Sequence, residues 1–150
     1  MSLENHVAVV TGAGRGIGRA IALRLAEAGA DVVCVSHTEA NSQKVADEVT
    51  ALGRKSWPVA VDVSDTGAVE GAVGKILEDT GGVHILVNNA GVTRDGLLMR
   101  MSEEDWDTVL DTNLKGAFTM TKAFTRPLRK AENARIINIA SVVGLTGNAG

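Results

Sequence analysis

This sequence contains no tyrosine, one cysteine and two prolines, and aromatic residues make up only 3% of it. A single cysteine excludes an internal disulfide and fits a reducing compartment. No apolar run approaches the roughly 18 residues that a membrane-spanning helix requires. The first residues, MSLENHVAVV, lack the basic and then apolar segments of a signal peptide. We therefore expect a cytoplasmic protein, although a mature organellar protein would have the same features.

Neither sign of charge is in large excess. The chain has 15 Lys and Arg residues and 18 Asp and Glu residues, for a net charge of −3. That balance excludes the global basic field that binds nucleic acid. No cluster of His, Cys and Asp residues has metal-ligand spacing, so no metal is expected. The 45% apolar content and the length of 150 residues suit one globular domain, which we place at residues 1–150.

Seventeen glycines are present, and apolar runs alternate with helical patterns along the whole chain. Strands are predicted at residues 7–10, 31–36, 56–61, 84–87 and 135–140. Helices are predicted at residues 17–28, 41–52, about 64–77 and about 102–124. This alternation implies right-handed crossovers and a parallel sheet covered on both faces. We predict a doubly wound, Rossmann-type α/β fold with strand order 3-2-1-4-5, and Pro58 places the third strand near an edge.

The segment TGAGRGIG packs four glycines between the first strand and the first helix. Backbone N–H groups at a helix N-terminus lack partners, and with the helix dipole they make an anion site. Gly12 can take the tight turn, Gly16 can admit a pyrophosphate, and Gly18 can let the helix pack closely on the sheet. The spacing is not G-x-G-x-x-G, so a plain chain reversal is the alternative.

Small and polar residues also follow other predicted strands, at the sheet edge where ligands bind in open α/β folds. Asp62 follows the third strand, and Asn88, Asn89, Ala90 and Gly91 follow the fourth. Folding alone is a poor explanation for such residues at three strand ends. The alternatives are that Asp62 caps the next helix and that Asn89 forms a turn.

In this order, TGAGRGIG, Asp62, NNAG, Asn113 and IASVVG resemble the short-chain dehydrogenase/reductase family over the whole chain. Within it, NNAGVTRDGLLMRMSEEDWDTVLDTNLKGAF and IINIASVVGLTGNAG are similar to 3-oxoacyl-[acyl-carrier-protein] reductases. The resemblance implies NADPH-dependent reduction of 3-oxoacyl thioesters on acyl carrier protein to 3-hydroxyacyl thioesters, in fatty acid synthesis. A reductase for another ketone or alcohol and a non-catalytic dinucleotide-binding fragment are the alternatives. Family members are often tetramers, so a homo-oligomer is expected.

The resemblance also assigns residues to a dinucleotide. In the family the turn holds the pyrophosphate, the residues after the third strand meet the adenine, and those after the fourth line the adenosine ribose. The implied residues are Gly12, Gly14, Arg15, Gly16, Ile17, Gly18, His37, Asp62, Val63, Asn89, Ala90 and Gly91.

The form of the cofactor can be argued from charge. An NAD site usually has an acid at the end of the second strand, where it binds the ribose 2′-hydroxyl. Here that end reads VSHT, and no carboxylate occurs before Glu39. Arg15 in the turn can meet a 2′-phosphate, and His37 or Thr38 can donate further hydrogen bonds. We therefore predict NADPH over NADH, with a merely solvated Arg15 as the alternative.

Asn113 and Ser141 are the candidate catalytic residues. Asn113 shares helical spacing with apolar residues between Trp106 and Ala117, so it is expected to face the sheet. In the family this asparagine helps to hold a water relay, and the serine hydroxyl binds the substrate carbonyl oxygen. A satisfied core asparagine and a serine that caps a turn are the alternatives.

Two further features bear on activity. Arg126, Arg129 and Lys130 end the long helix, as a solvated surface or, alternatively, as a contact for an acidic carrier protein. The family's proton donor is a tyrosine about a dozen residues after the serine, with a lysine four residues later. Neither occurs before Gly150. We expect both, with the C-terminal part of the family fold, to lie outside these residues, and the chain alone to be nearly inactive.

Overall fold

A computed structural model describes residues 2–147 and contains one five-stranded sheet, all of whose strand pairs are parallel. The strand order is β3-β2-β1-β4-β5, as predicted. The strands are β1 (Val7–Thr11), β2 (Asp31–Ser36), β3 (Ser56–Ala60), β4 (Ile85–Asn88) and β5 (Arg135–Asn138). Pro58 does lie in an edge strand, where a missing N–H donor is tolerated.

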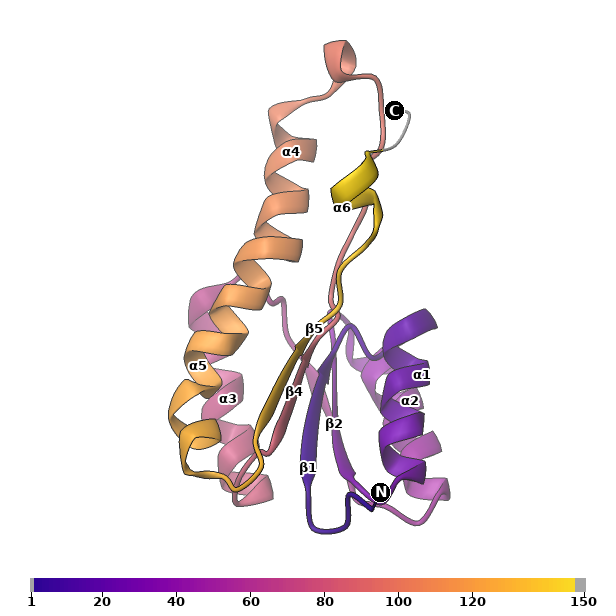
Figure 1. Cartoon of the computed structure of the whole chain (residues 1–150), viewed down its shortest axis with the longest axis vertical. Helices are drawn as coiled ribbons and strands as arrows, with labels where there is room; N and C mark the ends of the chain where they lie inside the picture. The colour runs from indigo at the N-terminus through magenta and orange to yellow at the C-terminus, as the bar shows by residue number, and fades with distance from the viewer. Residues whose placement is uncertain (1, 148–150) are drawn as a thin grey trace.

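Helices cover both faces of this sheet (Figure 1). They are α1 (Gly16–Glu27), α2 (Glu39–Ala51), α3 (Thr66–Thr80), α4 (Glu103–Leu110), α5 (Gly116–Lys130) and α6 (Val143–Thr146), with short segments η1 (Leu98–Arg100) and η2 (Asp111–Lys115). Helices α1 and α2 contact each other, and so do α3 and α5. The architecture is therefore the predicted Rossmann type. Within residues 2–147, no helix has the length and apolar character that crossing a membrane requires.

Alternate residues of each central strand enter two separate cores. Val7 and Val9 of β1 join one core, with side chains of α3 and α5. Ala8 and Val10 join the other, with side chains of α1 and α2. All five residues of β1 are buried, which confirms the prediction of strands buried on both faces.

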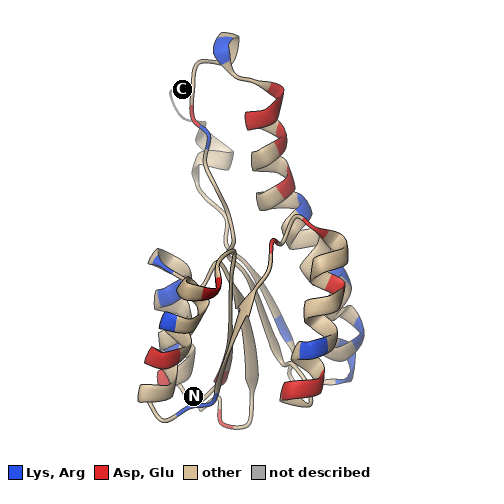
Figure 2. Cartoon of the chain, turned by 180° about the vertical axis from the view of Figure 1, so that it is seen from behind, with Lys and Arg blue, Asp and Glu red and all other residues tan. Residues whose placement is uncertain are grey.

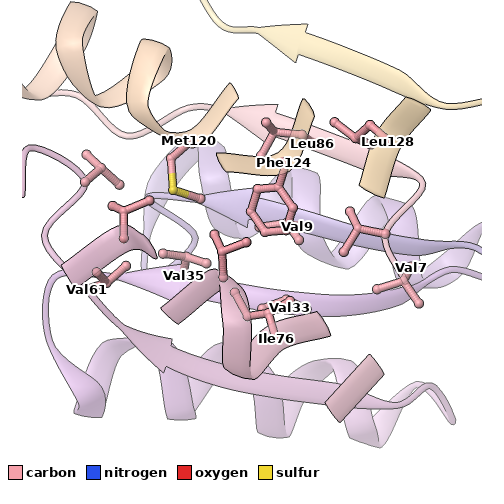
Figure 3. Packing of buried hydrophobic residues seen from close by; sticks show 14 residues of the cluster. Val7, Val9, Val33, Val35, Val61, Ile76, Leu86, Met120, Phe124 and Leu128 are labelled. Atoms are coloured by element: carbon pink, nitrogen blue, oxygen red, sulfur yellow. The ribbon is translucent and has the colours of Figure 1, made fainter. Parts of the chain in front are cut away.

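The first of these cores holds the largest buried side chains. Phe124 and Met120 of α5 are fully enclosed and lie over the strands beside Leu86 and Val9 (Figure 3). Burial of such side chains supplies about 1.5–3 kcal/mol each relative to exposure. This contact fixes α5 across the sheet.

Helix α3 begins after a capping aspartate and ends at a glycine. The side chain of Asp65 accepts a hydrogen bond from Ala68 N at 3.0 Å, so Asp65 is the N-cap. The helix runs to Thr80, three residues beyond the predicted end at Leu77. It stops at Gly81, whose φ of 75° is readily adopted by glycine.

The predicted long helix differs from the observed one in its buried face. The exposed fractions of Trp106, Leu110 and Leu114 are 56%, 38% and 68%, so the prediction that this stripe faces the sheet is wrong. A π-helical segment, η2, separates α4 from α5 and changes the phase of the helix. Beyond it the buried side chains are those of α5, and the expected end near residue 124 moves to Lys130.

Strand β5 lies at the other edge of the sheet and is shorter than predicted, because it ends at Asn138, where its pairing partner β4 also ends. The exposed fractions of Ile136 and Ile137 are both 44%. No other strand among residues 2–147 pairs with the outer edge of β5.

Protonation of His84 is expected to weaken the fold. Its Nδ1 accepts a hydrogen bond from Val7 N at 3.2 Å, and the His6 ring lies 5.0 Å away between centroids. Burial, and secondarily the charge of His6, lowers the pKa of His84. The unfolded chain therefore binds a proton more readily, and the free energy of unfolding falls as the pH drops below about 6.5.

Urea unfolding at several pH values measures this effect. The variant His84→Asn keeps an acceptor for Val7 N but does not titrate, so its free energy of unfolding should decline less on acidification. An identical decline in the native protein and the variant would contradict the assignment.

Candidate functional site

The four glycines of the turn after β1 meet different surroundings. A Cβ atom on Gly18 would lie 2.2 Å from the Gly12 carbonyl oxygen, and one on Gly14 would lie 2.6 Å from Asn41 Cβ. Gly12 has a φ of 64° and is also crowded, by Ala90 Cα at 2.9 Å. Gly16 has a φ of 54°, but nothing lies within 4 Å of its Cβ position. Three glycines thus allow close packing, and Gly16 faces open space.

Hydrogen bonds fasten this turn to the end of β4. Asn89 Nδ2 donates to the Thr11 carbonyl at 2.9 Å and to the Gly12 carbonyl at 3.3 Å. Thr11 Oγ1 accepts from the backbone N of Asn89 and of Ala90, both at 2.9 Å. Asn89 therefore organises the turn, which agrees in part with the alternative that it forms a turn. Thr11 is not among the site residues predicted from sequence, although its hydroxyl at the end of an apolar strand is a signal.

The turn fits a phosphate group. Helix α1 begins at Gly16 after Arg15, and its first turn has no acidic residue. The first N–H groups of a helix have no intrahelical acceptor and attract anions. The open space beside Gly16 leaves room for an anion to approach these N–H groups, and a side chain at this position would enter that space. We call this space, next to the first N–H groups of α1, the cradle. Arg15 and Ile17 are exposed at the same place.

Asp62, Val63 and His37 gather at the carboxyl ends of β2 and β3. Asp62 Oδ1 accepts from Ser64 Oγ at 2.7 Å and from Ser64 N at 2.9 Å, and these hydrogen bonds lower the pKa of Asp62. Its Oδ2 lies 3.7 Å from His37 Nε2. Val63 is buried, and a Cβ on Gly116 would lie 2.7 Å from its Cγ2. Because Asp65 caps α3, the alternative that Asp62 does so is wrong.

Asn113 lies in η2 and holds the segment that follows NNAG. Its Oδ1 accepts from Val92 N at 2.8 Å, and its Nδ2 donates to the Val92 carbonyl at 2.9 Å. The position of a Cβ on Gly91 would be 3.3 Å from the same Oδ1. Asn113 is exposed, so the expectation that it faces the sheet is wrong. Its amide is instead satisfied by a neighbouring loop.

An open cavity of about 730 Å³ lies between α5 and the carboxyl ends of β4 and β5. Its lining includes Asn88, Asn89, Ala90, Gly91, Asn113, Phe118, Thr121, Lys122, Asn138 and Ile139. Asn88 Nδ2 donates to Asn138 Oδ1 at 2.8 Å and to Thr121 Oγ1 at 3.1 Å. The NNAG segment and Asn113 thus share one cavity.

Ser141 lies beyond β5 and is not part of that lining. Its hydroxyl accepts from Val143 N at 3.2 Å, as expected of a serine that caps a turn. Among residues 2–147, no hydrogen bond joins Ser141 to Asn113. The structure therefore brings Asn113, but not Ser141, to the cavity.

Other chemistry has little support in the described part of the chain. No group of three or more His, Cys, Asp or Glu side chains within residues 2–147 could hold a metal ion. Burial raises the pKa of the Cys34 thiol to about 11. A thiol with that pKa stays protonated at neutral pH and is a poor nucleophile.

Comparison with known proteins matches the chain to one family. A family profile described as short chain dehydrogenase matches residues 6–150. Two 3-oxoacyl-[acyl-carrier-protein] reductases named FabG, from Vibrio cholerae and Escherichia coli, are 48% and 45% identical over 150 residues. The chain spans 60% of the length of each.

A solved structure gives the same result. It belongs to a protein from Sinorhizobium meliloti described as a short-chain alcohol dehydrogenase, with a TM-score of 0.94 and 37% identity. The match covers 99% of this chain and 59% of that one. The chain therefore belongs to the short-chain dehydrogenase/reductase family.

Proposed function

We propose that residues 1–150 form the dinucleotide-binding domain of an NADPH-dependent reductase. It would act on 3-oxoacyl thioesters carried by acyl carrier protein and yield 3-hydroxyacyl thioesters for fatty acid synthesis. The observation that carries this proposal is the glycine turn clamped to β4, with open space at Gly16 before a helix N-terminus. Identity of 44–48% to FabG reductases supports the substrate class.

The chain's own residues hold the cofactor, which supplies a hydride when it is bound. The N–H groups that open α1 would bind the pyrophosphate beside Gly16, where the helix dipole adds to the attraction. Asp62 and Val63 would contact the adenine, and His37 and Arg15 would contact the ribose 2′-phosphate. Asn89, Ala90 and Gly91 would line the adenosine ribose site.

Two residues would act on the substrate side. Ser141 binds the carbonyl oxygen through its hydroxyl, and Asn113 holds a water relay from its place in η2. π-helical segments often occur at functional sites, which supports a role for Asn113. The proton donor would be a tyrosine outside residues 1–150. Because general acid catalysis contributes about 10²–10⁴-fold, residues 1–150 alone should bind nucleotide yet reduce little.

Arg15 is expected to select NADPH. Replacing Arg15 with alanine removes a charge-assisted hydrogen bond to the 2′-phosphate. The dissociation constant for NADP⁺ should therefore rise by at least about tenfold. Affinity for NAD⁺ should change little. Arg24→Ala, at the far end of the same helix, is the control and should leave both affinities as in the native chain. Equal losses for NADP⁺ and NAD⁺ in Arg15→Ala would contradict this role.

Two surfaces would serve partners. Lys and Arg residues, drawn blue in Figure 2, occur along α5, where Arg126, Arg129 and Lys130 would meet an acidic carrier protein. Asp and Glu side chains follow α4, and the exposed stripe Trp106, Leu110, Leu114 and Phe118 joins the two helices. A second copy would cover this exposed apolar stripe, which supports a homo-oligomer.

Nucleotide binding by the purified chain tests the proposed function. Calorimetric titration should show binding of NADP⁺ at one site per chain. That binding should be lost in Gly16→Val, which puts a side chain into the open space and strains the turn at a φ of 54°. Because residues 1–150 alone should reduce little, the second step measures substrate binding and not turnover. A chain that holds NADP⁺ should bind carrier-linked and pantetheine-linked 3-oxoacyl thioesters if it belongs to a reductase, whereas a fragment that binds only the dinucleotide should bind neither. A chain that binds no nucleotide would refute the proposal.

A further inference from the structure

His37 and Asp62 form a pair at the carboxyl edge of the sheet. His37 follows the last residue of β2, and its Nε2 lies 3.7 Å from Asp62 Oδ2. The other carboxylate oxygen of Asp62 accepts two hydrogen bonds from Ser64, which hold the carboxylate in place. The His37 side chain is 79% exposed, so a solute can reach the rest of its ring.

The charges around this pair have both signs. Asp62 is the anion nearest to His37, and the Ser64 hydrogen bonds favour its ionised form. Lys115 of η2 adds positive charge toward Asp62. Glu39 begins α2 two residues after His37, and Arg15 belongs to the adjoining turn, in which Gly14 packs on Ser36 and Asn41.

The imidazole ring can serve two anions only when it is protonated. A neutral imidazole has one N–H donor and one acceptor nitrogen. If its N–H donates to Asp62, its acceptor nitrogen faces the second anion, and if its N–H donates to the second anion, its acceptor nitrogen faces Asp62. An imidazolium has two donors and a positive charge. A phosphate that approaches the free side of His37 therefore favours the protonated ring.

We propose that NADPH binding takes up a proton at His37, which then bridges the 2′-phosphate and Asp62, and that NADH binding takes up none. This inference rests on the proposed function, because it concerns the same nucleotide site. The proton comes from solvent and is released when the nucleotide leaves, so no bond to carbon forms or breaks. His37 is then a specificity-determining residue whose preference for the phosphorylated cofactor strengthens as the pH falls.

Calorimetry in pairs of buffers that differ in ionisation enthalpy measures the proton directly. At about pH 7.5, above the titration of the phosphate near pH 6, NADP⁺ should take up a substantial fraction of one proton per site. NAD⁺ should take up none. The dissociation constant for NADP⁺ should fall roughly three- to tenfold between about pH 8.5 and 7, while that for NAD⁺ stays level.

Two variants test whether His37 is the group that takes up the proton. His37→Gln keeps a polar side chain that cannot titrate, so both the proton uptake and the pH dependence for NADP⁺ should be lost. His6→Gln, at the amino edge of the sheet, should retain both. Ring resonances of His37 in NMR titrations should also keep their protonated position to higher pH with NADP⁺ bound.

The outcomes separate the two proposals. Tight NADP⁺ binding without proton uptake, or with uptake that persists in His37→Gln, would overturn the role of His37 and leave the nucleotide site intact. A chain that binds neither nucleotide at any pH would refute the proposed function and this inference with it.

Discussion

Gly18→Ala is expected to weaken NADP⁺ binding by about 100-fold or more and to destabilise the fold by about 1–3 kcal/mol. Its new Cβ atom would lie 2.2 Å from the Gly12 carbonyl oxygen and 2.4 Å from Asn89 Nδ2. Those atoms belong to the turn and to the side chain that clamps it, so neither can move without opening the cradle. Calorimetric titration with NADP⁺ and urea unfolding measure the two effects.

Gly74→Ala is the matched control. Gly74 lies inside α3, and nothing lies within 4 Å of its Cβ position, so alanine should stabilise the helix by about 0.8–1 kcal/mol. Nucleotide affinity should not change. A Gly18→Ala chain that binds NADP⁺ as tightly as the control would show that the close approach at Gly18 does not shape the site.

A second variant covers the case in which Gly18→Ala does not fold. Thr11→Val keeps the shape of the side chain but removes the hydroxyl that accepts from Asn89 N and Ala90 N. Two half-buried donors then lose their partner, at a cost of at most about 1–3 kcal/mol each. Weaker NADP⁺ binding in a folded Thr11→Val chain would show that these hydrogen bonds shape the site, and native affinity would show that they do not.

Phe124→Ala should cost about 3–5 kcal/mol of the free energy of unfolding, through lost burial and the cavity that remains. Phe124 is fully buried against the strands, in the core beside Met120 and Leu86 (Figure 3). Phe118→Ala, on the same helix, is the control, because Phe118 is 63% exposed and its loss should change stability by about 0.5 kcal/mol or less. Urea unfolding of the two variants gives the comparison, and equal losses would contradict the assigned face of α5.

Local patterns were sufficient to predict the sheet. Runs such as VAVV and VVCV fill two cores, and each is followed by a glycine or polar turn. This alternation predicts the doubly wound fold, whose usual strand order is the one observed. The face of the long helix was not predictable in this way. Periodicity groups Trp106 with Leu110 and Leu114, but it does not say whether that group contacts the sheet, and the π-helical segment η2 has no local signal that we recognised.

The residues of the candidate site were easier to predict from sequence than the hydrogen bonds that join them. The sequence predicts the glycines and Asn89 as site residues, and in the structure Asn89 contacts Gly12 and Gly18. The bond from Thr11 to the residues after β4 joins positions 78 and 79 apart in the chain, so only folding brings them together. For Asn113, helical spacing indicated burial, whereas its amide is satisfied by Val92 across a separation of 21 residues.

The most direct test is to record backbone amide NMR resonances of the chain while NADP⁺ is added. We predict that the largest changes occur at Gly16, Ile17 and Gly18, whose N–H groups open α1 and would meet the pyrophosphate. Resonances of Arg15 and His37 should respond to NADP⁺ more than to NAD⁺. Changes confined to another part of the molecule, with the turn unaffected at saturation, would contradict the account.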